Sequence, residues 1–569
     1  MWSKLTVDMS ALTAERKPLD KQLYQLGGRS LISQFMFKHV PPTCDPLGEQ
    51  NVLILAGGLL AGTNFTTAYR VSFGGKSPLT GGIKESNAGG SLGVLLAAQG
   101  LRLISVHGLP KDDKLYILNI KADNSVEFLD AEEYRGMGTG EFSEIMHKRY
   151  GDKASVACIG VAGERKYLGA SIHVTEYGTL HPSRVAARGG IGALMGSKGL
   201  KGIVIEKPTT DYKVEYADEA MFKEASLELN KAIAEAVKTD PFHNIGTIST
   251  IEATGVNGIL PVQNFSGKLF PDYKKVGAEQ FMENLSKRGG KNKVACQPGC
   301  VVRCSNVYND ADGKYLTSSF EYETVALFGP NCCINDLDAI ARMDSMCDDI
   351  GLDTIETAAA VAVAMEGGKI PWGDAKAAIG LLEEVKQGTE FGKILGNGCE
   401  SVGKHLGVKR IPVVKHQAIA GYEPRNTKGT GITYAKSPQG ADHTAGLTMG
   451  RAFSDSGRTA QAYASCKVQV AMCFADSMMC IFAFVHVVPK LPLLAKLMAG
   501  LYGGPSDDIT RVTLGIGVRT LLSELNFNKQ AGFTDADDKL PEFFYNEISE
   551  ATGSVFDIHP VEMETLYNF

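Results

Sequence analysis

Short apolar runs separated by turn residues fill the first third of the chain and predict a sheet-rich region. One such run, 52–56, reads as a strand. Two more, 115–120 and 126–129, flank a turn-forming Ala-Asp-Asn-Ser segment and predict a hairpin. A further apolar strand at 202–205 precedes a polar stretch. We therefore expect the first domain to span residues 1–208.

Farther along the chain, apolar positions recur every three or four residues, which is the helical period. The segment Leu337–Cys347 presents one apolar face and stops before Gly351, a residue suited to a helix C-cap. A second helix is predicted over 354–366, opened by a capping box formed by Asp353 and Glu356. The pattern from here to the end of the chain is mainly helical.

The expected fold class is α+β, with the N-terminal sheet-rich domain followed by two mainly helical domains. We place the second domain at 209–410 and the third at 411–569, because Pro412 interrupts the helical pattern. A length of 569 residues supports this division, since a single hydrophobic core stops growing at roughly 250–300 residues.

The composition argues against two kinds of partner, nucleic acid and a membrane. The net charge is −6 and no block is dense in Lys and Arg, so the sequence lacks the cluster of positive charge that binds the phosphates of nucleic acid. The most apolar stretch, 471–488, includes ionisable residues and falls short of the ~20 apolar residues of a membrane span, so we expect a buried helix. No secretory signal pattern is evident, and we expect a cytoplasmic protein whose twelve cysteines are thiols or metal ligands.

Three closely spaced cysteines, Cys296, Cys300 and Cys304, are the sharpest chemical signal. Pro298 and Gly299 bend the chain between the first two, which lets the thiolates converge. Three such ligands with a distant fourth are typical of a [4Fe–4S] cluster. A zinc site would need a closed set of four ligands, commonly two Cys-x-x-Cys pairs, and the sequence does not offer two such pairs. The alternative is three buried core thiols.

Two glycine-rich stretches, 81–91 and 184–192, contain polar and basic residues. Backbone N–H groups in such turns form concavities that bind anions such as phosphate. Neither stretch matches the Rossmann or P-loop fingerprint, which disfavours NAD and ATP. Alone, each stretch reads as a structural turn. Together with Arg70, they indicate a pyrophosphate site.

These motifs resemble, in the same order and over nearly the whole chain, those of the tungsten-containing aldehyde ferredoxin oxidoreductases. The segments that carry the resemblance are Gly58–Thr63, Arg70, Lys76–Gly81, Ser86–Gly90, Arg184–Lys198, the cysteine cluster, Phe320–Thr324, Asp348–Asp353, Gly421–Arg425, Ala441–His443 and Asp476–Cys480. The resemblance implies that the first domain forms a base under two pyranopterin dithiolenes. These would hold tungsten or molybdenum without a protein ligand, beside a [4Fe–4S] cluster.

The resemblance also implies cofactor contacts by individual residues. These are Arg70, Asn87, Gly89, Gly90, Arg184, Ala186, Arg188, Gly189, Asp348, Leu352, Asp353 and Asp476. Arg70 is similar to an arginine between the cluster and the pterin. The backbone carbonyls of Asn87 and Ala186 would hold a Mg²⁺ ion that joins the pterin phosphates. The Asp348–Asp353 element would contact one pterin, and Asp476 the other.

The fourth cluster ligand implied by the resemblance is Cys480. The sequence departs from the family here, because both gaps between the three clustered cysteines hold three residues and the Asp476–Cys480 element is one residue short. Cys473 therefore remains a rival. Arg342 stands where the best-known members place a glutamate that binds an iron between subunits, which argues against that iron and leaves the oligomeric state open.

Glu323 and His443 match the two polar residues beside the metal. The resemblance therefore implies an enzyme that oxidises small aldehydes and passes electrons to ferredoxin or a ferredoxin-like iron–sulfur subunit. Glu323 would act as base on the attacking water, and His443 would hydrogen-bond the carbonyl oxygen. On the residues alone, structural roles are an alternative for both. The alternative functions are a low-potential reductase of a carboxylic acid or aromatic thioester, and a cluster-only electron-transfer protein.

Overall fold

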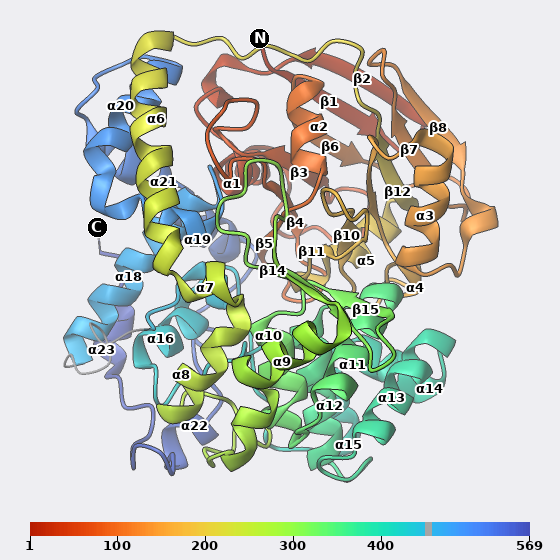
Figure 1. Ribbon diagram of the computed structural model, residues 1–569, viewed down its shortest axis with the longest axis vertical. Helices are drawn as coiled ribbons and strands as arrows, with labels where there is room; N and C mark the ends of the chain where they lie inside the picture. The colour runs from red at the N-terminus through yellow and green to blue at the C-terminus, as the bar shows by residue number, and fades with distance from the viewer. Residues whose placement is uncertain (450–457, 569) are drawn as a thin grey trace.

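Two six-stranded sheets form the N-terminal part of the computed structural model, which describes residues 1–449 and 458–568 (Figure 1). The first sheet has the order β2-β1-β6-β3-β4-β5, with strands Thr13–Pro18, Ser3–Asp8, Leu101–His107, Leu53–Gly57, Val71–Lys76 and Ile83–Ala88. The second has the order β11-β10-β9-β12-β7-β8, with strands Arg184–Ala186, Ile172–Val174, Ser155–Cys158, Leu200–Ile205, Tyr116–Ile120 and Val126–Asp130. The pairs β1–β6 and β7–β12 are parallel, and the other pairs are antiparallel.

The two sheets share one hydrophobic core. Alternate residues such as Leu53 and Leu55 on β3 and Ile203 and Ile205 on β12 are buried in the same cluster, as expected for side chains that point to one face of a strand. The helices α1 (Gly28–His39), α2 (Leu92–Ala98) and α5 (Ile191–Ser197) pack on these sheets. Edge strands β5 and β11 lie against each other, which brings the two glycine-rich stretches together.

The rest of the chain is mainly helical. Its helices are α6 (Glu219–Ala236), α7 (Pro241–Asn244), α8 (Thr250–Val256), α9 (Ala278–Arg288), α10 (Tyr322–Phe328), α11 (Leu337–Ile350), α12 (Thr354–Glu366), α13 (Ala375–Gln387), α14 (Glu390–Gly396), α15 (Cys399–Leu406), α16 (Lys428–Lys436), α18 (Arg458–Ala475), α19 (Ile481–Phe484), α20 (Leu491–Tyr502), α21 (Ile509–Gln530), α22 (Phe543–Asn546) and α23 (Pro560–Glu564). A three-stranded antiparallel sheet joins β13 (Lys291–Val294), β14 (Ser305–Asn309) and β15 (Tyr315–Ser318), and β16 (Val413–Val414) pairs with β17 (Gln417–Ala418).

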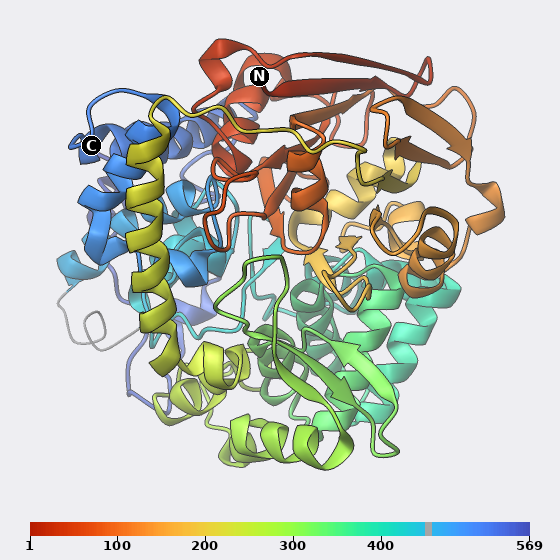
Figure 2. The same ribbon diagram turned by 45° about the horizontal axis from the view of Figure 1, so that its top comes forward.

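Figures 1 and 2 show how these parts meet. The N-terminal sheets, in red to orange, occupy one end of the molecule, and α9 to α15, in green to teal, pack beneath them. The C-terminal helices α18 to α21, in blue, lie along one side, where α6 packs against α20. The segment between β13 and β14 lies near the junction of the three parts.

The expected α+β class is confirmed, as is the hairpin, which is β7 and β8. The two helices expected around Gly351 are α11 and α12, and Gly351 has a φ of 82° at the C-cap. Asp353 caps α12 by accepting a hydrogen bond from Ile355 N at 2.9 Å. The capping box is wrong, because the Glu356 carboxylate instead accepts hydrogen bonds from the backbone N–H groups of Cys399 and Ala418. The domain limits 1–208, 209–410 and 411–569 stay predictions.

The single buried helix expected over 471–488 is wrong. Helix α18 ends at Ala475, and a turn separates it from the short helix α19. The turn forms because its backbone bonds elsewhere: Leu59 N donates to Ser477 O at 2.9 Å and Cys480 N donates to Thr67 O at 3.1 Å. Of the helices in the described parts of the chain, none combines the length and apolarity that crossing a membrane requires.

Candidate active site

A cavity of about 550 Å³ lies where the three parts of the chain meet. The predicted site residues on its wall are Arg70, Gly89, Arg184, Cys296, Cys300, Cys304, Glu323, Asp348, Leu352, Asp353, His443 and Cys480. The predicted residues that are not part of this wall are Asn87, Gly90, Ala186, Arg188, Gly189 and Asp476. The structure therefore gathers residues that are hundreds of positions apart in the sequence around one space.

Four buried cysteines line this cavity. Cys296, Cys300 and Cys304 lie between β13 and β14, and Cys480 immediately precedes α19. In the described residues, no group of three or more His, Cys, Asp or Glu side chains converges as the ligands of a single metal ion would. A [4Fe–4S] cluster does not require that convergence, because each thiolate binds its own iron. The four thiols are thus a suitable donor set for a cluster.

Cys480 and Cys473 provide a matched test of the fourth ligand. Cys473 packs with Val470 and Leu521 and is not part of the cavity wall, whereas Cys480 is. We expect Cys480→Ala to lose most of about four irons per chain, and Cys473→Ala to keep them. Iron is measured by mass spectrometry on protein purified without oxygen. Full iron in the Cys480 variant and loss in the Cys473 variant would reverse the assignment.

Two arginines lie beside the cysteines. Arg70 donates from Nε to Asn87 Oδ1 and from Nη2 to Asn87 O, the latter at 3.0 Å. Arg184 is buried on the same wall. The pKa of Cys296 is lowered to about 6, first by a hydrogen bond with Cys300 and then by Arg184 and Arg70, against the opposing effect of burial. The pKa values of Cys304 and Cys480 are raised by burial and that of Cys300 by its hydrogen bond with Cys296, whereas Arg184 and Arg70 favour the thiolate form that binds iron.

The first glycine-rich stretch holds the cysteine segment against the first domain. A Cβ on Gly89 would lie 3.3 Å from Cys296 Sγ and 3.5 Å from Arg70 Nη1, so a larger residue would crowd both. Gly90 has a φ of +98° and donates from its N–H to Cys296 O at 2.9 Å. This backbone conformation favours glycine. Gly90 supports the site from behind the wall.

The second glycine-rich stretch is tied to both helical regions by Arg188. Its guanidinium lies 3.5 Å from Asp353 Oδ2 and donates to the backbone carbonyls of Ala418 and Ala441. Gly189 follows with a φ of 78°. In the structure this stretch is a scaffold, and cofactor contacts by Arg188 and Gly189 stay predictions.

The two residues expected to hold Mg²⁺ lie on adjoining strands. Asn87 is on β5 and Ala186 is on β11, and these edge strands contact each other. Asn87 O accepts a hydrogen bond from Arg70. The Mg²⁺ role of both carbonyls stays a prediction.

The side chains of Glu323 and His443 lie close together on the cavity wall. Glu323 is in the first turn of α10, and His443 follows a turn that contains Asp442. His443 Nε2 lies 3.4 Å from Glu323 Oε1, and Glu323 Oε2 accepts a hydrogen bond from Gly421 N at 2.7 Å. Among the described residues, buried Glu323 Oε1 and His443 Nδ1 have no hydrogen-bond partner. Such atoms are costly unless a ligand or water satisfies them.

The electrostatics of this pair suit proton transfer. Burial raises the pKa of Glu323, while His443 and a bond from Gly421 N partly oppose that rise. Beside His443, burial raises the pKa of Asp442, but Lys84 and Arg188 outweigh it and hold this pKa far below its ordinary value. Lys84 Nζ lies 2.5 Å from Asp442 Oδ2. Lys84 was not predicted as a site residue, although it lies inside the first glycine-rich stretch.

The element that contains Asp348, Leu352 and Asp353 turns at Gly351 and lines the cavity. Leu352 forms an isolated bridge with Ala170 of the first domain. Burial raises the pKa of Asp348 well above its ordinary value, and Asp344 adds to the rise. These three residues lie together as the motif implied, and their pterin contacts stay predictions.

Asp476 lies behind the wall, in a buried ionic network that the sequence did not reveal. Arg29 on α1 donates from Nε and Nη2 to the Glu524 carboxylate at 2.9 and 2.8 Å, and its Nη1 lies 3.4 Å from Asp476 Oδ2. A Cβ on Gly28 would lie 2.2 Å from Asp476 O, so the start of α1 closely approaches this turn. The only local hint of this close approach is the Gly27-Gly28 pair at the start of α1. Nothing in the sequence shows that its partner is a turn more than four hundred residues later.

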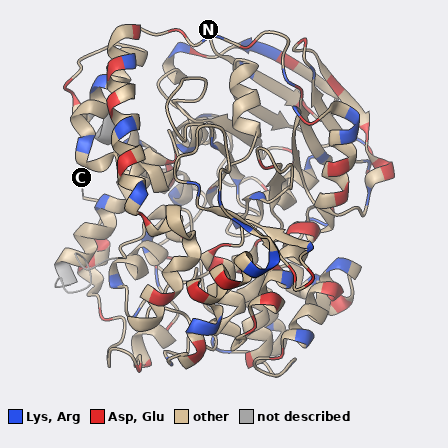
Figure 3. Cartoon of the chain, in the orientation of Figure 1, with Lys and Arg blue, Asp and Glu red and all other residues tan. Residues whose placement is uncertain are grey.

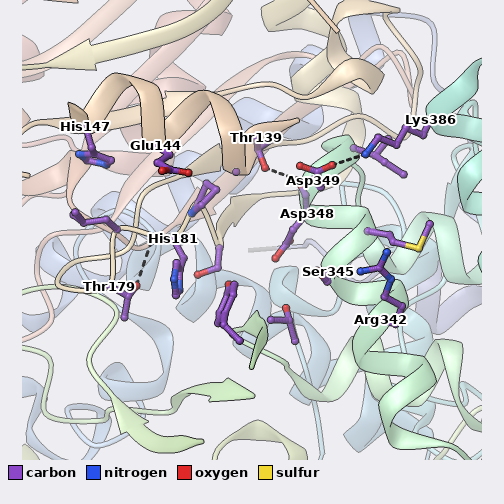
Figure 4. Close-up of a pocket in the computed structure, with 18 of the residues that line it drawn as sticks. Thr139, Glu144, His147, Thr179, His181, Arg342, Ser345, Asp348, Asp349 and Lys386 are labelled. Carbon is purple, nitrogen blue, oxygen red and sulfur yellow. Dashed lines mark hydrogen bonds and ion pairs between the residues drawn. The ribbon is translucent and has the colours of Figure 1, made fainter. Parts of the chain in front are cut away.

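A second cavity of about 700 Å³ adjoins the first, since Asp348 and Ser183 line both. Figure 4 shows Asp348 at its centre and Arg342 projecting from α11. Lys386 pairs with Asp349 at 2.9 Å on its rim. Arg342 thus lies on this second cavity and supplies no carboxylate for an iron between subunits.

Comparison with known proteins gives the family. The model of the aldehyde ferredoxin oxidoreductase N-terminal domain matches residues 4–207, and that of domains 2 and 3 matches residues 224–567. The tungsten-containing aldehyde ferredoxin oxidoreductase of Pyrococcus furiosus is 30% identical, over 96% of this chain and 92% of its own length. An aliphatic sulfonate oxidoreductase WOR-like subunit of the same organism is 27% identical, over 77% and 74%.

A solved structure confirms the fold. The active-site complex of benzoyl-coenzyme A reductase with 1,5-dienoyl-CoA superposes with a TM-score of 0.81 at 20% identity, covering 99% of this chain and 92% of that one. At this identity the likeness concerns architecture alone. The family models cover most of the sequence, and the chain therefore belongs to the aldehyde ferredoxin oxidoreductase family, a family of oxidoreductases.

Proposed function

We propose that the protein oxidises aldehydes to carboxylic acids at a tungsten or molybdenum bis-pyranopterin, and that a [4Fe–4S] cluster passes the electrons to ferredoxin or a ferredoxin-like subunit. The observation that supports this most directly is the pair Glu323 and His443. Two of their buried polar atoms, Glu323 Oε1 and His443 Nδ1, make no hydrogen bond within the described residues, and both residues line the same cavity as four cysteines.

The wall fits the groups that this function requires. Four thiols form the donor set of a cluster, and Arg70 and Arg184 provide positive charge beside them for an anionic cofactor. When bound, the metal and pterins would supply two-electron chemistry and the cluster would export electrons singly. Nothing on the wall selects tungsten over molybdenum, because the resemblance implies no protein ligand to the metal.

The side chains would act on the substrate as follows. Oxidation adds oxygen from water to the aldehyde carbon, removes two electrons and releases protons. Glu323 Oε1 would accept a proton from the attacking water, since burial raises its pKa and so makes it a stronger base than an ordinary glutamate. His443 would donate a hydrogen bond to the carbonyl oxygen as negative charge develops there. Asp442 and Lys84 would hold the imidazole in place.

The first experiment combines composition with activity. Protein purified without oxygen is analysed for tungsten, molybdenum, iron and pterin, and then tested for aldehyde-dependent reduction of a small dye. We expect about four irons and one tungsten or molybdenum per chain, with pterin. Iron without either metal, from cells supplied with both, would overturn the proposal in favour of an electron carrier. Metal and pterin with no aldehyde oxidation would favour the alternative reductase.

The structure provides no specific support for the alternative reductase. A metal-binding cysteine on the cofactor side would favour it. Of the cysteines in the described residues, those on the cavity wall are the four assigned to the cluster.

A further inference from the structure

Three segments form one continuous surface over the cysteines. They are 237–246 with α7, 291–304 with the clustered cysteines, and 481–490 with α19. We call this surface the cysteine-loop face. Figures 1 and 2 show the loop between β13 and β14 at the front of the molecule, beside α7.

Side-chain contacts join the three segments. Lys293 Nζ donates to Asn244 Oδ1 at 3.2 Å, and the His243 ring lies 3.0 Å from Val302 O. On the other side, the Phe242 and Phe482 ring centroids are 4.9 Å apart. The three segments are therefore packed against one another.

This face is basic, although the whole chain has a net charge of −6. The exposed cations in its three segments are Lys238, Lys291, Lys293, Arg303 and Lys490. Its one acidic residue, Asp240, is paired with His486 at 3.1 Å and its side chain is only 14% exposed. Lys238 is paired with Glu235, just outside the face. Figure 3 marks the Lys and Arg positions in blue. An acidic partner would be steered toward this region.

Exposed apolar side chains lie within the same face. Val488 is 45% exposed, two residues from the cation Lys490, whereas Val485 is 51% exposed but also lines the cavity. Single exposed apolar residues are common on any protein surface. The charge of the face is therefore what favours a partner protein of opposite charge.

The cysteines lie directly beneath this face. Cys300 and Cys304 are 5% and 8% exposed, and their neighbours Gly299 and Arg303 are exposed. An electron carrier seated here would be separated from the thiols by little protein. The same cysteines also line the cavity on which Glu323 and His443 lie.

We propose that the cysteine-loop face is the docking surface for a small acidic iron–sulfur electron carrier. The proposal rests on the proposed function, because aldehyde oxidation supplies the electrons. Oxidation of one aldehyde releases two electrons, so two oxidised carriers would each accept one electron at this face. No bond is formed or broken in this step.

The test reverses charge on the face without touching the cysteine loop itself. The triple variant Lys238→Glu, Lys291→Glu, Lys490→Glu is compared with a control of equal charge change, Lys111→Glu, Lys153→Glu, Lys376→Glu, at exposed lysines elsewhere. Aldehyde oxidation by the whole enzyme is measured with a negatively charged ferredoxin and, separately, with a small uncharged quinone dye.

We expect the KM for ferredoxin to rise about tenfold or more in the face variant at low salt, with the difference shrinking as salt screens the charges. The control and the dye reaction should change little. Equal ferredoxin KM values in both triple variants would overturn the docking proposal. A change in oligomeric state in the face variant alone would also overturn it, because the face would then contact a second copy. A parent enzyme inactive with the dye would instead count against the proposed function.

Discussion

Glu323→Gln is expected to lower kcat for aldehyde oxidation by about 100-fold or more while leaving metal, iron and pterin contents unchanged. The glutamine retains the shape of the side chain, and its amide oxygen can still accept the bond from Gly421 N that now reaches Glu323 Oε2. It loses the ability to take a proton at the position of Oε1, which is 3.4 Å from His443 Nε2. The measurement is steady-state aldehyde oxidation with a dye acceptor, alongside cofactor analysis.

The pH profile gives an independent readout of the same carboxylate. Burial raises the pKa of Glu323, so the ionised base is lost as pH falls through a value above that of an ordinary glutamate, ~4.3. The parent should therefore lose kcat on the acid side, and the residual activity of Glu323→Gln should not show this limb. Glu279→Gln, an exposed glutamate in the first turn of α9, is the matched control. A Glu323 variant with parental kcat would show that this carboxylate is not the base.

How much of the fold could be predicted depends on how far apart in the sequence the interacting residues lie. The hairpin and the helices around Gly351 were predicted from periodicity and turn residues, because these signals act within a few residues. The prediction of a single helix over 471–488 was wrong, since the apolar composition of this stretch could not show that Ser477 O accepts a hydrogen bond from Leu59 N in the first domain. Glu356 failed as a capping residue for the same reason, because its partners are Cys399 and Ala418.

The residues of the candidate site also divide into those that local spacing reveals and those that it does not. The three clustered cysteines could be recognised by spacing alone, whereas Glu323 and His443 depended on a family resemblance. Their contact joins α10 to a turn more than a hundred residues later, which no spacing rule predicts. The buried pair of Lys84 and Asp442 was missed entirely, because charged residues usually read as surface positions.

Arg29→Met is expected to destabilise the protein by about 3–5 kcal/mol, because it leaves two buried carboxylates without their cation. Glu524 is fully buried and Asp476 is 8% exposed. Methionine fills much of the same volume, so the loss is mainly one of charge. Thermal inactivation half-lives and denaturant unfolding are suitable measurements, since a protein of this size can unfold irreversibly. The matched control is Lys121→Met, which removes an exposed pair with Glu127 and should change stability little, because solvent screens the pair.

The pH dependence of this loss distinguishes lost charge from lost packing. Burial raises the pKa of Asp476 to about 6, and Arg29 limits the rise. Without Arg29 the folded-state pKa rises further above the unfolded value, so the folded variant binds more protons and its deficit should shrink as pH falls. A deficit that does not change with pH would indicate packing. Adding Glu524→Gln should restore part of the stability, because it removes one unpaired charge, and purely additive losses would show that Arg29 and Glu524 are not coupled. Since the network holds the turn that ends at Cys480, we also expect the Arg29 variant to lose iron during inactivation.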